Sequence, residues 1–106
     1  MTRPERLDDT SVARWLQSHP TWHLVDAHLV REIRTTDYPS AVRILEAQID
    51  TAQRMDHHPD VVVGYCRVRF ELWTHDRAGL TQLDLDYADE LDEIVSSRFA
   101  DVVVAT

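Results

Sequence analysis

Apolar residues recur at helical spacing in three stretches of the chain. The first stretch predicts a short helix that begins near Asp8 or Asp9, whose side chains suit an N-cap, and ends near Ser18. The second stretch predicts one continuous helix from about Pro39 to Met55, with Asp37 as its N-cap.

A third helix is expected to open at Thr81, because Thr81 and Asp84 have the spacing of a capping box. In all three stretches the apolar positions lie three or four residues apart, so each helix has one face that a core can bury. The residues expected on these faces are Val12, Trp15 and Leu16, then Tyr38, Ala41, Val42, Leu45, Ile49 and Ala52, and finally Leu80, Leu83, Tyr87, Ala88, Leu91, Ile94 and Val95.

Two pairs of strands are predicted between the helices. Residues 22–25 and 29–35 read as short strands joined by a turn at Asp26-Ala27-His28, with alternate residues of 29–35 on one side. Residues 61–73 are rich in β-branched and aromatic side chains but too long for one typical strand. They should therefore form a hairpin that bends near Cys66-Arg67, and its second half alternates like a half-buried strand.

The predicted element order is α-β-β-α-β-β-α. Four antiparallel strands with one face open to water need the three helices packed on the other face, which makes an α+β fold. We expect a single domain over residues 1–106, because a chain of this length builds one core. The edge strands would stay exposed, which invites pairing between subunits.

Composition narrows the function classes. The formal net charge of −8 argues against direct binding of nucleic acid, which needs a basic surface. No apolar run approaches the roughly 20 residues of a membrane helix, and the N-terminal residues lack the apolar segment of a signal peptide. The only cysteine, Cys66, excludes an internal disulfide and fits a reducing, cytoplasmic location.

Three of the six histidines fall in two short polar segments at the ends of regular elements. His57 and His58 precede the third strand, and His75 follows the fourth. Antiparallel neighbours place the start of one strand beside the end of the next, so the two segments should meet at one edge of the sheet. Extended backbone sends His57 and His58 to opposite sides, so at most one shares a wall with His75 unless the chain turns.

Two kinds of chemistry suit such a cluster. Imidazole transfers protons near neutral pH, and a carboxylate such as Asp84, close in sequence, would fix the tautomer of one ring. Imidazole is also the commonest ligand of transition metals. The adjacent pair His57-His58 is awkward for a tetrahedral site, and Cys66 has no partner cysteine. The residues therefore favour proton transfer over metal binding.

Other features receive simpler interpretations. We assign no function to His19, His23 and His28. Trp73 is out of phase with the core residues of its strand and is a candidate pocket wall. The acidic residues of the last helix are read as a solvated face, and the apolar tail at 102–104 either packs on a neighbouring subunit or frays.

The stretch Asp56-His57-His58-Pro59-Asp60, followed by Tyr65, Val68, Thr74-His75, Gly79-Leu80-Thr81 and Asp84, closely resembles the signature of pterin-4a-carbinolamine dehydratases. The similarity extends from about Asp8 to Val95. It implies an enzyme that removes water from 4a-hydroxytetrahydropterin to give quinonoid dihydropterin, which is recycled for aromatic amino acid hydroxylases. A hydroxylase of that pathway is then an expected partner, and the family assembles as homodimers or homotetramers.

The resemblance also implies the site, with no metal and no organic cofactor. His57 and His75 correspond to the acid/base pair, His58 to a substrate-positioning residue, and Asp84 to a carboxylate that holds an imidazole. One imidazolium would protonate the departing 4a-hydroxyl while a neutral imidazole accepts the N5 proton. The pterin contacts implied are Asp56, Pro59, Trp73, Thr74 and Asp76.

Some positions depart from the family pattern. Gln53 stands where a supporting glutamate is common, and it keeps an acceptor but no negative charge. Val61, Ile33 and Thr35 replace usual aromatic residues. These departures predict reduced activity, and they leave open a second reading in which the chain is a protein-binding or dimerisation module that has kept the fold.

Overall fold

The computed structural model describes residues 4–104, and its elements follow the predicted order. The expected absence of a signal peptide concerns in part residues 1–3, which lie outside the described residues. The elements are α1 (Asp9–Gln17), β1 (His23–Val25), β2 (His28–Arg34), α2 (Tyr38–Ala47), α3 (Ile49–Met55), β3 (Asp60–Gly64), β4 (Arg67–Leu72), a short 3-10 helix (His75–Arg77) and α4 (Gln82–Arg98).

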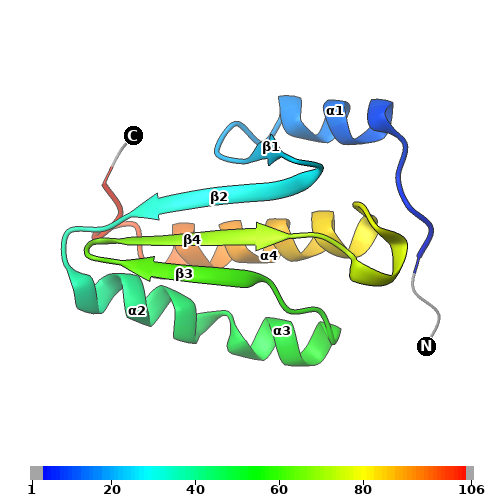
Figure 1. Ribbon diagram of the computed structural model, residues 1–106. Coiled ribbons are helices and arrows are strands. Elements are labelled where there is room, and N and C mark those ends of the chain that lie inside the picture. The colour runs from blue at the N-terminus through cyan, green and yellow to red at the C-terminus, as the bar shows by residue number, and fades with distance from the viewer. Residues whose placement is uncertain (1–3, 105–106) are drawn as a thin grey trace.

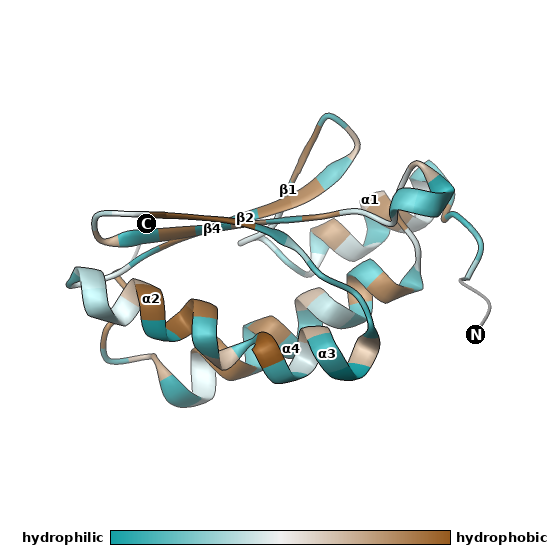
Figure 2. Ribbon diagram, turned by 60° about the horizontal axis from the view of Figure 1, so that its bottom comes forward, coloured by the Kyte–Doolittle hydropathy of each residue, from teal (hydrophilic) through white to brown (hydrophobic). Residues whose placement is uncertain are grey.

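The four strands form one antiparallel sheet in the order β1-β2-β4-β3 (Figure 1). Figure 2 shows α2, α3 and α4 on one face of this sheet, and α1 reaches the same core through buried Val12. The predicted α+β class is confirmed. The most completely buried apolar side chains of the core are Leu29, Ile33, Ala41, Ile44, Val68, Phe70, Leu72, Tyr87, Ala88 and Leu91.

The turn between β1 and β2 is shorter than the sequence indicated. Asp26 and Ala27 both have positive φ, 50° and 65°, which is the backbone of a two-residue hairpin turn. His28, expected in the turn, is instead the first residue of β2 and pairs with Val25. The tighter turn therefore places the His28 side chain on the sheet.

The predicted helix over residues 39–55 is interrupted at Gln48, between α2 and α3. The Gln48 side chain donates to the Leu45 carbonyl at 2.9 Å and accepts a hydrogen bond from the Tyr87 hydroxyl of α4. The Gln48 side chain thus bonds the Leu45 carbonyl, which in a continuous helix would accept a backbone N–H, and the helix is interrupted there. Ile49, which follows the interruption, and Tyr38, the first residue of α2, were both expected to face the core but are about half exposed, at 52% and 49%.

The last helix begins as predicted. Thr81 and Asp84 form a reciprocal capping box, and the same helix also buries Leu85, which lies outside the predicted apolar face. At 17 residues α4 is the longest helix. Across residues 4–104 no helix combines the length and apolar character needed to span a bilayer.

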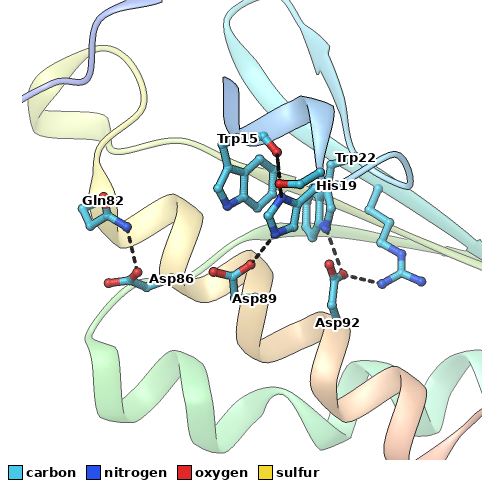
Figure 3. A network of polar contacts seen from close by, with 9 residues as sticks. Trp15, His19, Trp22, Gln82, Asp86, Asp89 and Asp92 are labelled. Atoms are coloured by element: carbon cyan, nitrogen blue, oxygen red, sulfur yellow. Dashed lines mark hydrogen bonds and ion pairs between the residues drawn. The ribbon is translucent and has the colours of Figure 1, made fainter. Parts of the chain in front are cut away.

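A polar network ties the start of the sheet to α4 (Figure 3). The His19 imidazole lies 2.8 Å from the Asp89 carboxylate, and the Trp22 indole N–H donates to Asp92 at 2.9 Å. Asp92 also accepts from the Arg31 guanidinium at 2.5 Å. Part of the acidic face of α4 is therefore a packing surface, which corrects its reading as simply solvated.

The apolar tail packs on its own chain. The Thr36 N–H donates to the Val102 carbonyl, and the Val104 N–H donates to Arg34 at the end of β2. A bridge between Thr35 and Val103 closes the contact. The tail is therefore not frayed.

The buried contact between Tyr87 and Gln48 gives a test of the helix interruption. Burial raises the pKa of the Tyr87 hydroxyl, which keeps it a donor. Tyr87→Phe leaves the Gln48 carbonyl oxygen buried without that donor, so we expect the free energy of unfolding to fall by about 1–2 kcal/mol. Urea denaturation followed by circular dichroism measures it. Tyr65→Phe is the matched control, because Tyr65 is 85% exposed. Equal losses in the two variants would contradict the assignment.

Candidate active site

A pocket of about 380 Å³ lies where the C-terminal end of α3 meets the segment after β4. Asp60 at the start of β3 pairs with Glu71 near the end of β4, so the flanking segments are neighbours, as the sequence indicated. The pocket is lined by Asp56, His57, His58, Thr74, His75 and Asp76. The structure thus brings the three predicted histidines to one site.

His57 enters the site from the interior of the protein. Helix α3 ends at Asp56, which adopts the left-handed conformation with φ 49°, and the His57 N–H then donates to the Ala52 carbonyl at 3.1 Å. This closing turn directs the His57 side chain inward, where it is 5% exposed, while His58 remains exposed.

Asp84 lies directly behind His57 and is fully buried. One carboxylate oxygen is 2.6 Å from His57 Nε2, and the other accepts from the Thr74 hydroxyl at 2.8 Å and the Thr81 N–H at 2.9 Å. Because the carboxylate accepts, the Nε2 of His57 carries the proton. The carboxylate that caps α4 therefore also sets the orientation and tautomer of the catalytic candidate His57.

His58 has a weaker support. Its Nε2 is 2.7 Å from the side-chain oxygen of Gln53, which lies one helical turn earlier on α3. The glutamine accepts the hydrogen bond but offers no negative charge to an imidazolium. The position that departs from the family pattern is thus in direct contact with a site histidine.

His75 lies nearer to solvent than Thr74, which precedes it. Thr74 is buried and donates to Asp84, whereas Trp73 is partly buried and His75, at the start of the 3-10 helix, is exposed. The His75 ring contacts the Trp73 indole at a centroid distance of 4.3 Å with a 30° tilt. Within residues 4–104 the exposed His75 imidazole makes no hydrogen bond.

The remaining predicted residues differ in their closeness to the pocket. Asp56, Thr74 and Asp76 line it directly, while Pro59 and Trp73 are not among the lining residues. Trp73 reaches the site through its contact with His75. A residue to which no function was assigned, His28, stacks on Trp73 at 4.0 Å. His28 lies opposite Trp73 because Leu29 pairs with Leu72. The sequence did not indicate this pair, because it placed His28 in the turn and not in the strand.

Metal binding was the rival chemistry for these histidines. Over the described range 4–104, no three or more His, Cys, Asp and Glu side chains are arranged to hold a metal ion. The carboxylate of Asp84 contacts the His57 imidazole from behind the pocket.

Comparison with known proteins identifies the family. Residues 5–94 match the family model described as pterin 4 alpha carbinolamine dehydratase. The chain belongs to this dehydratase family. The resemblance found in the sequence is confirmed, and the family is one of hydro-lyases, which remove water from a pterin carbinolamine.

Relatives match the chain over most of its length. Proteins provisionally named pterin-4-alpha-carbinolamine dehydratase are 37% identical over 90 residues in Chloroflexus aurantiacus, which is 85% of this chain and 97% of the relative. The corresponding Metallosphaera sedula protein is 38% identical over 89 residues, or 84% and 93% of the two chains. A crystal structure from Brucella melitensis, titled transcriptional coactivator/pterin dehydratase, is 28% identical with a TM-score of 0.80, covering 85% of this chain and 98% of that one.

The contacts of Asp84 predict a large effect on dehydratase stability. Asp84→Ala leaves the donors on His57, Thr74 and Thr81 buried without their acceptor, and we expect the free energy of unfolding to fall by about 3 kcal/mol or more. Chemical denaturation measures the loss. Asp86→Ala is the control, because Asp86 is exposed and bonds only the Gln82 side chain. A loss for Asp84→Ala no larger than for the control would contradict this role.

Proposed function

We propose that this protein catalyses the dehydration of 4a-hydroxytetrahydropterin to quinonoid dihydropterin and water by histidine acid/base catalysis. The observation that carries the proposal is the buried Asp84–His57 pair, which opens on a pocket that two further imidazoles line. Membership of the pterin carbinolamine dehydratase family indicates a pterin carbinolamine as the substrate of that site.

The reaction needs one group that donates a proton to the departing hydroxyl and one group that accepts the proton from N5. The bond between C4a and the hydroxyl oxygen breaks, and the oxygen leaves as water after it accepts a proton. N5 loses its proton, and the electron pair of that N–H bond forms the C4a=N5 double bond. Imidazoles provide both functions near neutral pH, because each can be present as acid or as base.

We assign His57 and His75 to this pair. Asp84 holds the Nε2 proton of His57, so Nδ1 is the atom that exchanges a proton with the substrate, and the carboxylate stabilises the imidazolium that forms. His75 is exposed at the opposite wall, where it can exchange its proton with solvent between turnovers.

The other residues bind and orient the pterin. His58 positions the substrate, with Gln53 as its hydrogen-bond partner. Asp56 and Asp76 contribute carboxylates to the pocket, which suit the N–H groups of a pterin ring. Pro59, Trp73 and Thr74 complete the proposed set, Thr74 through its hydroxyl bond to Asp84.

The setting of the reaction follows from the same proposal. The single domain of residues 1–106 would recycle tetrahydrobiopterin for an aromatic amino acid hydroxylase in the cytoplasm, with no metal or organic cofactor. Homodimers or homotetramers are supported by apolar side chains on both edge strands: Leu24 and Val25 of β1 and Val62 of β3 are between 42% and 55% exposed.

A second candidate function is a protein-binding or dimerisation module with little catalysis. Two observations favour it: Gln53 provides no charge beside His58, and the similar Brucella melitensis protein is described as a transcriptional coactivator as well as a pterin dehydratase. The exposed imidazoles of His58 and His75 at the pocket favour the enzyme, because exposed side chains contribute little to the stability of the fold that a binding module must keep.

The first activity test is stopped-flow measurement of 4a-hydroxytetrahydropterin dehydration with and without the protein. We expect acceleration by the wild type and a decrease in kcat of about 10²–10⁴-fold in His57→Ala, the range that general acid/base catalysis contributes. His23→Ala, at an exposed position of β1, should keep the wild-type rate. No acceleration by folded wild type would favour the binding module, and wild-type rates in His57→Ala would reject the assigned roles.

The Gln53 contact predicts a variant that gains activity. Gln53→Glu places a negative charge about where the amide oxygen now lies, 2.7 Å from His58 Nε2, and so favours the charged imidazole. We expect kcat/KM to rise about threefold by this added charge. Gln17→Glu, an exposed residue at the end of α1, adds the same charge outside the pocket and should leave the rate unchanged. A Gln53→Glu variant no faster than wild type would show that the missing charge does not limit the reaction.

A further inference from the structure

The open face of the sheet carries a series of stacked rings that ends at the pocket. His28 of β2 lies parallel to the Trp73 indole, with centroids 4.0 Å apart and planes 7° apart. Trp73 in turn contacts His75, which lines the pocket. The strand register explains the arrangement: Leu29 pairs with Leu72 on the core side, so the residues that flank them, His28 and Trp73, are neighbours on the outer side.

His28 is held in place by a carboxylate. Its Nδ1 is 2.5 Å from Glu71, and each side chain of the pair is only about a quarter exposed, at 26% and 25%. Arg69 donates to the other Glu71 oxygen at 3.0 Å. The hydrogen bonds from His28 and then Arg69 hold the pKa of Glu71 below its usual value, although partial burial opposes them. Glu71 is thus an ionised anchor, and the His28 ring is fixed between it and the indole.

His75 lacks the kind of support that the other two site histidines have. His57 is bonded to Asp84 and His58 to Gln53, whereas the side chain of His75 has no hydrogen bond within the described residues. An exposed side chain without such a bond changes rotamer within nanoseconds. Among the described residues, the ring contact that restrains the His75 imidazole is its packing on Trp73.

We propose that His28 is a positioning residue of the active site: anchored by Glu71, it holds the Trp73 indole in the orientation that fixes the His75 imidazole at the pocket. This inference rests on the proposed function, in which His75 is one of the acid/base pair. Misorientation of a reacting group by about an ångström is enough to lower a rate strongly, so a residue outside the pocket can affect turnover.

The structural part of the proposal is tested by NMR, without substrate. Protons above an indole ring are shifted by its ring current, so the ring protons of His75 should differ from those of free histidine; their signals are assigned by their loss in His75→Ala. In His28→Ala the His75 signals should move most of the way to the free value. In His28→Phe, which keeps a stacked ring but loses the bond to Glu71, they should move less. The control His23→Ala should leave them unchanged.

The catalytic part is tested by steady-state dehydration kinetics of the same variants. We expect His28→Ala to lower kcat about fivefold through misorientation of His75, and to change KM by less than kcat, because His28 itself does not line the pocket. His28→Phe should recover at least half of the lost kcat. His23→Ala should match the wild type in both constants.

The outcomes separate this inference from the proposed function. Unmoved His75 signals in His28→Ala overturn the inference whatever the kinetics. Moved signals with an unchanged kcat also overturn it, because orientation then has no catalytic effect. If the wild type itself does not accelerate dehydration, the proposed function fails, and the NMR shifts alone decide whether His28 positions His75. Moved signals with a lowered kcat and partial recovery in His28→Phe support the inference.

Discussion

The buried carboxylate of Asp84 is the constraint on which the rest of this dehydratase depends. It completes the capping box of α4, accepts the Thr74 hydroxyl at the end of β4, and holds the His57 imidazole after α3. A charge without solvent exposure is stable only where donors surround it, and here the donors come from three separate elements. The same bonds that join the last helix to the sheet edge therefore also orient the His57 ring at the pocket.

The pocket lies where the segment before β3 meets the segment after β4. His57 and Thr74 are its buried lining residues, whereas His58 and His75 are exposed. The three histidines consequently have different supports: a buried carboxylate for His57, an amide for His58, and an indole for His75. One ring is rigid and shielded while another is exposed, which suits the different tasks of holding a charge and exchanging a proton with water.

Most elements and the placement of the site could be predicted, because they rest on local chemistry. The capping box at Thr81 and Asp84, the N-caps at Asp8 and Asp37, and the hairpin at Cys66 each depend on residues close in sequence. Two features could not be predicted in this way. The interruption at Gln48 depends on Tyr87, 39 residues further along. The place of His28 depends on two non-glycine residues, Asp26 and Ala27, that adopt positive φ in the turn.

The sequence by itself determined the element order, the dehydratase signature and the meeting of His57, His58 and His75 at one edge, because hydrophobic periodicity, capping residues and antiparallel pairing act over short ranges. The sequence also indicated that Asp84 supports an imidazole, but only the tertiary structure decided that this ring is His57 and that Glu71 holds His28. The contacts of Asp84 with His57, and of Glu71 with His28, join residues 27 and 43 positions apart. Contacts over such distances depend on how whole helices and strands pack, and local sequence patterns do not specify that packing.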